Sequence, residues 1–238
     1  MASLRSFAQC IGVEGDFSVL HHFFGLLSVP LFKELSLLQQ IDRLKHSHFH
    51  VNVILVGDDA FSTSDLDDVN RAVFDTREIY SKVGVGVGRV QWFAIPVAMA
   101  DGHDDIASDD EAVELTNSWT VHNNGLDVFV IRNGWLEDGA DRTGLSDQYA
   151  SCDKDADKSM SGSVVSLNGI LSGITMAHEM GHDLGLYHIV DLDADELDEA
   201  TEDEIKNLMF PFAVSIAGQL HLWQVAIILQ HCRIRPGC

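Results

Sequence analysis

One short stretch of the chain combines metal-binding and proton-transferring side chains at fixed spacing. Residues 178–188 read HEMGHDLGLYH and contain the pattern H-E-x-x-H-x-x-G-x-x-H. Residues four apart on an α-helix lie on one face, so the imidazoles of His178 and His182 can converge on a single ion. Glycine accepts the left-handed conformation that ends many helices, so the chain can turn at Gly185 and bring His188 to the same ion. The spacing therefore predicts a metal site with three histidine ligands.

Three protein ligands leave one coordination position open for water, which is typical of catalytic rather than structural zinc. Imidazole nitrogens without a thiolate suit Zn²⁺ at a hydrolytic centre, where the pKa of a bound water falls from about 15.7 to roughly 7. Glu179 follows the first ligand and is too offset to complete the site. It is close enough to take the proton of that water as general base and to pass it to the leaving amine. A helix with merely solvated or buried histidines does not explain this combination.

Strands and helices alternate along the chain up to this stretch. Residues 133–162 are rich in Gly, Asp and Ser and are predicted to be mostly loop. Apolar β-branched runs predict strands, and apolar residues at helical spacing predict helices. The predicted strands cover residues 51–56, 85–95, 126–131 and 163–167, and the predicted helices cover residues 64–83, 109–119 and 171–184. This alternation predicts an α/β fold with a largely parallel sheet.

Apolar stripes indicate which helix faces pack inward. The helix that carries the histidine pattern has one stripe, formed by Ile174, Ala177, Met180 and Leu184, that is predicted to face the core. A closing helix is predicted over residues 218–232, with its inward face formed by Leu220, Trp223, Ile227 and Leu229. Another stripe at helical spacing occurs in the first 48 residues, at Leu35, Leu38, Ile41 and Leu44.

Composition and charge exclude several classes of partner. The 238 residues are 46% hydrophobic and 22% charged, which is ordinary for a soluble globular protein, and no run is long enough to span a membrane. The formal net charge of −22 disfavours nucleic acid and anionic membrane surfaces. The apolar run from Phe17 to Phe32 is broken by histidines and a proline, and no signal peptide is recognisable.

Weaker patterns concern calcium and a second group of histidines. Acidic residues in two segments partly match a calcium-binding loop, although each segment lacks an essential residue, so solvated acidic loops are the favoured interpretation and Ca²⁺ an alternative. The residues in question are Asp191, Asp193, Asp195, Glu199 and Glu202 in one segment, and Asp153, Asp155 and Asp157 in the other. His46, His48 and His50 alternate along the first strand and are predicted to be exposed histidines rather than a second metal site.

The extended histidine pattern resembles that of the metzincin metalloproteases. Residues 161–188, SGSVVSLNGILSGITMAHEMGHDLGLYH, are similar to the adamalysin or reprolysin branch, in which a strand runs directly into the active-site helix. Met209 and Pro211 have the Met-x-Pro form of the metzincin Met-turn, in which the methionine supports the metal site without ligating it. Ile189 stands where that branch usually has Asp.

The resemblance implies a fold, a reaction and a division of the chain. It implies an upper catalytic subdomain over residues 49–188, with a twisted, mostly parallel sheet and helices, and a small lower subdomain over 189–238 with the Met-turn and a C-terminal helix. Residues 1–48 are predicted to be a lead-in or propeptide-like segment. The implied protein is an extracellular, monomeric zinc endopeptidase that hydrolyses internal bonds of proteins or peptides.

The resemblance also implies a disulfide and a substrate-binding strand. Cys152 would pair with Cys232 or Cys238, since family members are mostly extracellular. An edge strand formed by Val164, Val165 and Ser166 would bind an extended peptide by strand addition. Residues 210–215 would wall the pocket for the side chain after the scissile bond.

Two alternatives to a peptidase are compatible with the pattern. One is a catalytically silent, zinc-stabilised binding or adhesion module of the same fold, against which the retained Glu179 argues, because a structural site needs no base. The other is a metal-dependent hydrolase of non-peptide substrates, which no further feature of the sequence supports.

Overall fold

The computed structural model of the chain describes residues 45–137, 139–147, 152, 154, 160–192 and 194–237. Several predicted features lie outside the described residues. They are the apolar stripe from Leu35 to Leu44, most of the propeptide-like segment 1–48, Cys238, and the three aspartates between residues 153 and 157. Among the described helices, none combines the length and the apolar character that crossing a bilayer requires.

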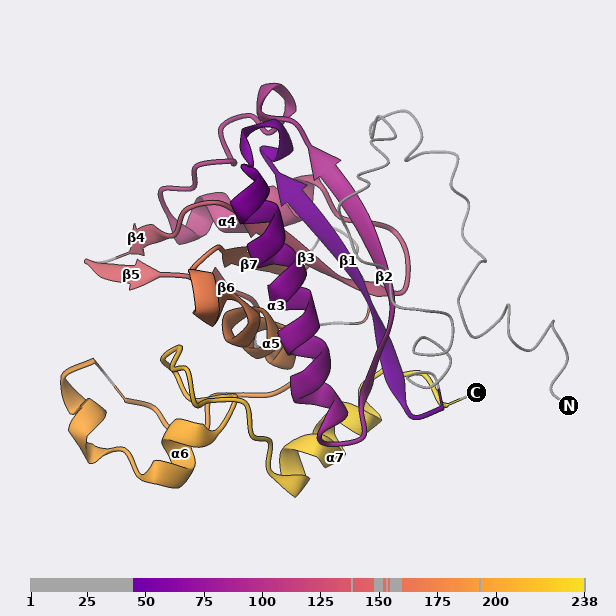
Figure 1. Ribbon diagram of the computed structural model, residues 1–238, viewed down its shortest axis with the longest axis vertical. Helices are drawn as coiled ribbons and strands as arrows, with labels where there is room; N and C mark the ends of the chain where they lie inside the picture. Colours follow the sequence, from indigo (N-terminus) through magenta and orange to yellow (C-terminus); the bar gives the residue numbers. More distant parts are fainter. Residues whose placement is uncertain are drawn as a thin grey trace, which may run out of the picture.

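A five-stranded sheet forms the centre of the molecule (Figure 1). Its strand order is β2-β1-β3-β7-β6, and the strands are β1 (His48–Val56), β2 (Gly86–Ile95), β3 (Gly125–Ile131), β7 (Ser163–Ser166) and β6 (Gly144–Leu145). The pairs β1–β2, β1–β3 and β3–β7 are parallel, and only β6 runs antiparallel to its neighbour β7. The predicted α/β fold with a mostly parallel sheet is therefore confirmed.

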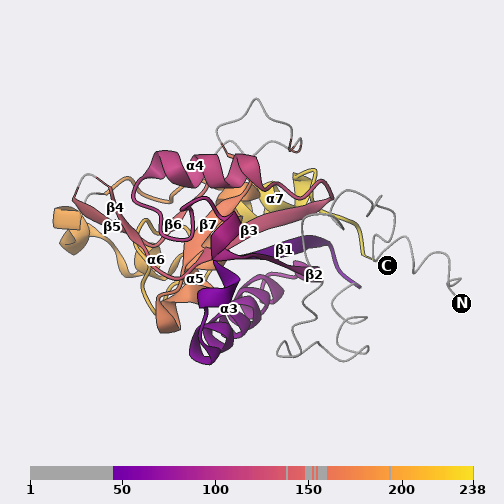
Figure 2. The same cartoon turned by 90° about the horizontal axis from the view of Figure 1, so that it is seen from above.

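Helices cover both faces of this sheet (Figure 2). Helices α3 (Thr63–Ser81) and α5 (Ser172–Asp183) lie on one face, and α4 (Asp109–Ser118) lies on the other. Strand β1 is buried along its whole length and serves both layers, because alternate side chains of a strand point to opposite faces. Val53 and Leu55 join the cluster beneath α3 and α5, whereas Ile54 and Val56 join the cluster beneath α4.

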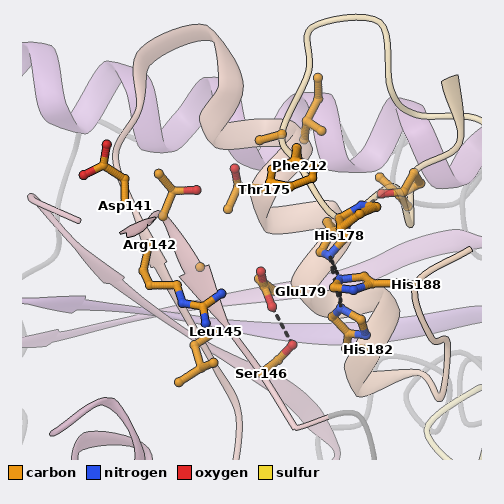
Figure 3. A pocket seen from close by; sticks show the side chains of 16 residues that line it. Asp141, Arg142, Leu145, Ser146, Thr175, His178, Glu179, His182, His188 and Phe212 are labelled. Carbon is orange, nitrogen blue, oxygen red and sulfur yellow. Dashed lines mark hydrogen bonds between the residues drawn. The ribbon is translucent and has the colours of Figure 1, made fainter. Parts of the chain in front are cut away.

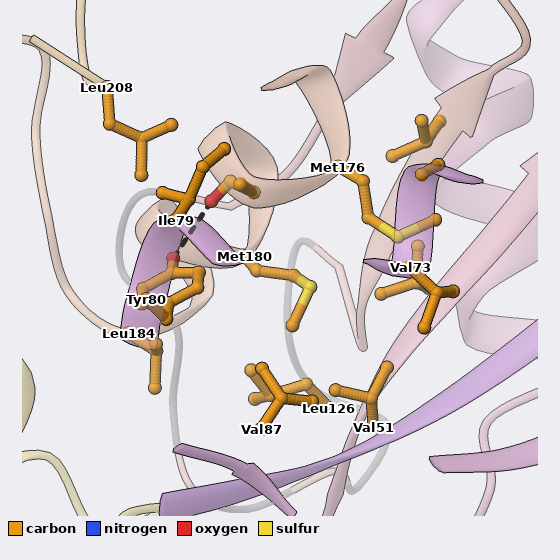
Figure 4. Packing of buried hydrophobic residues seen from close by; sticks show 14 of the residues in the cluster. Val51, Val73, Ile79, Tyr80, Val87, Leu126, Met176, Met180, Leu184 and Leu208 are labelled. Atoms are coloured by element: carbon orange, nitrogen blue, oxygen red, sulfur yellow. Dashed lines mark hydrogen bonds between the residues drawn. The ribbon is translucent and has the colours of Figure 1, made fainter. Parts of the chain in front are cut away.

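Helix α5 is fixed by close packing against α3. Its predicted stripe is buried: Met180 and Leu184 are fully buried, and Met176 and Met180 pack among side chains of β1, β2 and α3 (Figure 4). The Tyr80 hydroxyl of α3 donates a hydrogen bond of 2.9 Å to the Ala177 carbonyl, one residue before His178. Gly173 permits this approach, because a Cβ there would lie 2.5 Å from the Cβ of Asp75.

The segment predicted to be mostly loop contains three short strands. Strands β4 (Trp135–Glu137) and β5 (Ala140–Arg142) form an antiparallel hairpin, with Gly139 at φ +82° in its turn, and β6 follows at once. The loop prediction is wrong at these positions, because strands of two or three residues are too short to show an alternating pattern.

Strand β7 is an interior strand, so the prediction that Val164, Val165 and Ser166 form a free edge is wrong. Val164 pairs with Leu145, Val165 pairs with Gly144, and the Ser166 N–H donates to the Thr143 carbonyl at 2.9 Å. The two-residue strand β6 takes the outer position, which the sequence gives no pattern to reveal. Among the described strands, β6 therefore presents the free edge at this end of the sheet.

The C-terminal part holds α6 (Glu202–Lys206) and α7 (Leu222–Gln230). The predicted inward face of the closing helix is wrong for Trp223, Ile227 and Leu229, which are 50%, 38% and 45% exposed. The buried face instead contains Gln224, whose amide exchanges two hydrogen bonds of 2.8 and 3.0 Å with the Asn207 side chain. This buried amide pair sets the rotation of α7.

The predicted exposure of the strand-start histidines is confirmed for His46 and wrong for His48 and His50, which are buried. The C-terminal residues return to β1, and the backbones of His48 and Arg235 exchange hydrogen bonds of 2.9 and 2.7 Å.

Short 3₁₀ turns occupy Asp58–Ala60, Val97–Met99, Gly169–Leu171 and Ala194–Glu199.

A disulfide joins Cys152 to Cys232 across 80 residues, with the two Cα atoms 6.1 Å apart. This is one of the two pairings that the resemblance implied. The bond ties the segment before β7 to the residues that follow α7.

The hydrogen bond between α3 and α5 gives a stability prediction. Replacing Tyr80 by Phe removes a buried hydroxyl but keeps the ring, so the free energy of unfolding is expected to fall by about 1 kcal/mol in urea titrations followed by circular dichroism. Ser81→Ala is the matched control, since this hydroxyl bonds an exposed carbonyl on the same helix, and its effect is expected within about 0.5 kcal/mol. Equal stability of the Tyr80→Phe variant and the wild type would contradict this role of the hydroxyl.

Candidate metal centre

The end of α5 sets the direction in which His188 approaches the other histidines. The helix ends at Asp183, and Gly185 has φ +88°. The Gly185 N–H donates to the His182 carbonyl at 2.8 Å and the Leu186 N–H donates to the Gly181 carbonyl at 2.9 Å. This pair of bonds is a Schellman cap, and it turns the chain sharply back along the helix.

The three histidines meet at their Nε2 atoms (Figure 3). Nε2 of His178 lies 3.1 Å from that of His182 and 3.2 Å from that of His188, and the remaining pair is 3.2 Å apart. Nδ1 of His178 contacts the Leu208 carbonyl at 2.7 Å, and Nδ1 of His182 contacts the Leu186 carbonyl at 2.8 Å. Because a carbonyl oxygen can only accept, both Nδ1 atoms carry the proton, and the Nε2 lone pairs face one another.

This donor set fits a zinc ion. Zn–N bonds of about 2.0–2.1 Å in tetrahedral geometry place ligand nitrogens about 3.3 Å apart, close to the separations found here. Burial lowers the pKa of His182 to about 3 and that of His188 to about 4, and it also lowers the pKa of His178. The imidazoles are therefore neutral at neutral pH, as metal ligands must be.

Glu179 is buried beside the histidines, between α5 and β6. Its Oε2 accepts a hydrogen bond of 2.5 Å from the Ser146 hydroxyl. Burial raises the pKa of Glu179 to about 7, and this effect is partly opposed by the Ser146 hydroxyl and the Arg142 charge. A Cβ on Gly144 would lie 2.5 Å from Oε1 of Glu179, so β6 can lie this close to the carboxylate because residue 144 is a glycine. Arg142, Gly144 and Ser146 lie outside the histidine motif, and no sequence pattern indicated them as site residues.

A cavity of about 270 Å³ opens over the histidines and Glu179. Residues 141–146 form one wall, α5 forms the floor, and Pro211, Phe212 and Ala213 form the opposite wall. The predicted wall at residues 210–215 thus lies at the cavity in part, and Val164, Val165 and Ser166 do not line it.

Met209 lies directly beneath the metal-site helix. It is fully buried, and its Sδ is 2.6 Å from the position of a Cβ on Gly181, so a larger residue there would displace the Met209 side chain. The Met209 N–H donates to Oδ1 of Asn207 at 2.9 Å, and the Met209 carbonyl accepts from the Ile189 N–H at 3.0 Å. These bonds tie the segment after His188 to the turn that supplies the Leu208 carbonyl.

Two groups of residues among those described could hold a metal ion. The second is Cys152, His231 and Cys232, but its two sulfurs are joined in the disulfide and are not thiolates. Asp191, Glu199 and Glu202 do not form such a group among the described residues, and Asp193 lies outside them. Calcium binding therefore stays a prediction.

One comparison with known proteins identifies a family. A sequence model of the reprolysin-like metallopeptidases of family M12B matches residues 67–189, just over half of the chain. A solved structure of metalloproteinase-II from Bacteroides fragilis is similar at 15% sequence identity and a TM-score of 0.48, covering 76% of this chain and 53% of that one. The chain thus spans about half the length of that protein. No curated protein matches the sequence.

The histidine geometry predicts how zinc binding depends on single side chains. His182→Ala removes one of three converging nitrogens, so zinc affinity in competition with a chelating dye is expected to fall by roughly a hundredfold or more. His122→Ala, an exposed histidine away from the cavity, is the control and should bind like the wild type. If His182→Ala retains wild-type affinity, the three nitrogens do not form the zinc site.

Proposed function

Because the chain belongs to the reprolysin-like metallopeptidases of family M12B, we propose that it is a zinc-dependent endopeptidase whose metal is held by His178, His182 and His188. The observation that carries this proposal is the convergence of three Nε2 lone pairs within 3.1–3.2 Å, next to a buried carboxyl group. The Nδ1 contacts that hold the imidazoles of His178 and His182 support it further.

Zinc in this position supplies Lewis-acid chemistry, which polarises the scissile carbonyl and acidifies a water molecule. Glu179 takes the proton of the attacking water and delivers it to the nitrogen of the leaving amine. A pKa of about 7 suits both steps, since the carboxyl group can accept and return a proton near neutral pH. Ser146 orients the carboxylate by donating to its Oε2.

Met209 and Pro211 are proposed to form a Met-turn that supports the site without binding the metal. The contact of the Met209 sulfur with Gly181 supports this role, because Gly181 lies between the two helical ligands. Leu208, one residue earlier, holds Nδ1 of His178. The turn and the helix therefore fix each other.

The substrate is proposed to lie along β6 as an extended strand. Among the described residues, β6 is the outer strand at one end of the sheet, and it lines the cavity together with its neighbours in the chain. An added strand would exchange backbone hydrogen bonds with this edge, and its side chains would alternate between the cavity and solvent. The side chain after the scissile bond would meet Pro211, Phe212 and Ala213.

The remaining features are proposals of the same kind. We propose that the protein acts as an extracellular monomer on proteins or peptides. The disulfide between Cys152 and Cys232 supports the extracellular location. The division into an upper part ending at His188 and a lower part beginning at Ile189 is also proposed. It is supported by the cap at Gly185, where the chain leaves α5.

Casein cleavage by the zinc-loaded protein tests the proposal. The wild type is expected to cleave casein, and Glu179→Gln is expected to keep its zinc but lose activity by roughly a hundredfold or more, because it cannot accept the proton. A chelator should abolish activity, and added zinc should restore it. If zinc-loaded wild type cleaves neither casein nor a broad peptide library, the binding-module alternative replaces the peptidase.

Gly144 offers an independent test of how the base is positioned. A Cβ in this position would displace the Glu179 carboxylate, so Gly144→Ala is expected to reduce kcat by up to about a hundredfold while zinc content stays at one ion per chain. Gly84→Ala is the control for the general cost of replacing a glycine: a Cβ there meets nothing within 4 Å, its φ of +74° disfavours alanine, and kcat is expected to stay at the wild-type value. A Gly144→Ala variant with wild-type kcat would show that β6 does not position the base.

A further inference from the structure

Arg142 is the one cation among the described residues that line the cavity. The chain has 15 Lys and Arg against 37 Asp and Glu, so a positive side chain beside the candidate metal centre is not explained by the overall charge. Arg142 ends β5, two residues before β6 begins. The other charged side chains of the lining are Asp141 and the buried Glu179.

The guanidinium of Arg142 is directed toward the centre of the site. In Figure 3 it lies on the side of Leu145 and Glu179, whereas the Asp141 carboxylate points away from the histidines. Arg142 therefore stands where a bound peptide would pass.

The acidic groups among the described residues leave Arg142 available. Its nearest recorded acidic partner is Oδ2 of Asp109, at 3.9 Å, which is beyond hydrogen-bond distance. Oδ1 of Asp109 already accepts a bond of 2.7 Å from the Trp135 indole. The Arg142 side chain is 46% exposed, so its N–H groups can meet a ligand that enters the cavity.

We propose that Arg142 is a specificity-determining residue that selects peptides with an Asp or Glu side chain close to the scissile bond. The planar guanidinium presents paired N–H donors that match the two oxygens of a carboxylate. This inference rests on the proposed function because it assumes that a bond of the bound peptide is cleaved. Recognition of the acidic side chain itself needs only a peptide bound in the cavity. Long-range repulsion by the net charge of −22 acts in the opposite direction and is screened beyond about 8 Å at physiological salt.

The test uses peptide hydroxamates, whose metal-binding group anchors them at the zinc whether or not the protein cleaves peptides. Matched compounds carry Glu or Gln at each of the first three residues beside the hydroxamate, and their Kd values are measured by calorimetry at 0.15 M NaCl with the zinc-loaded full chain. At one position the wild type is expected to bind the Glu compound roughly tenfold more tightly than its Gln partner.

Two variants test whether Arg142 causes this preference for Glu. Arg142→Gln is expected to reduce the Glu-to-Gln ratio to about one, and Arg71→Gln, which removes an exposed positive charge from α3 away from the cavity, is expected to keep it near ten. The proposal is overturned if the wild type prefers Glu at none of the three positions, or if Arg142→Gln retains the preference. Failure of the peptidase assignment would appear separately, as absence of casein cleavage with this binding preference intact.

Discussion

The arrangement of the site depends on one constraint: three imidazole lone pairs must face one point without a proton between them. Two backbone carbonyls impose this on the helical ligands, since Leu208 and Leu186 hold the Nδ1 protons of His178 and His182. Burial keeps the rings neutral. The nitrogens that face inward are then electron-rich and mutually repulsive, and a cation is the natural partner for them.

Much of the surrounding fold serves to hold these two carbonyls and the helix between them. Leu186 is placed by the cap at Gly185, and Leu208 by the turn whose Met209 packs against Gly181. Helix α5 is in turn tied to α3 through Tyr80, and α3 and α5 share one cluster of buried side chains with the central strands. Close contacts at Gly173 and Gly181 therefore connect the candidate metal centre to the packed helices and the central sheet.

The sequence predicts those features of the fold and the site that depend on local patterns of residues. The α/β fold, the principal strands and helices, and the buried stripe of α5 follow from apolar periodicity, and the meeting of the three histidines follows from their spacing. What it misses is decided by contacts between distant segments. Strand β6 exists because it pairs with β7, and α7 takes its rotation from the amide pair of Asn207 and Gln224. The burial of His48 depends on the returning C-terminus, and His50 lies against Gly88 and Arg89 of β2. For the same reason Ser146, Gly144 and Arg142 carry no motif, although they surround the candidate base.

X-ray absorption at the zinc edge tests the central claim most directly, because it reports the atoms bound to the metal without reference to activity. The zinc-loaded protein is predicted to show nitrogen and oxygen neighbours alone at about 2.0–2.1 Å, with the outer-shell signal of three imidazoles. A sulfur neighbour at about 2.3 Å would place the zinc on a cysteine and would contradict the assignment of the metal to His178, His182 and His188.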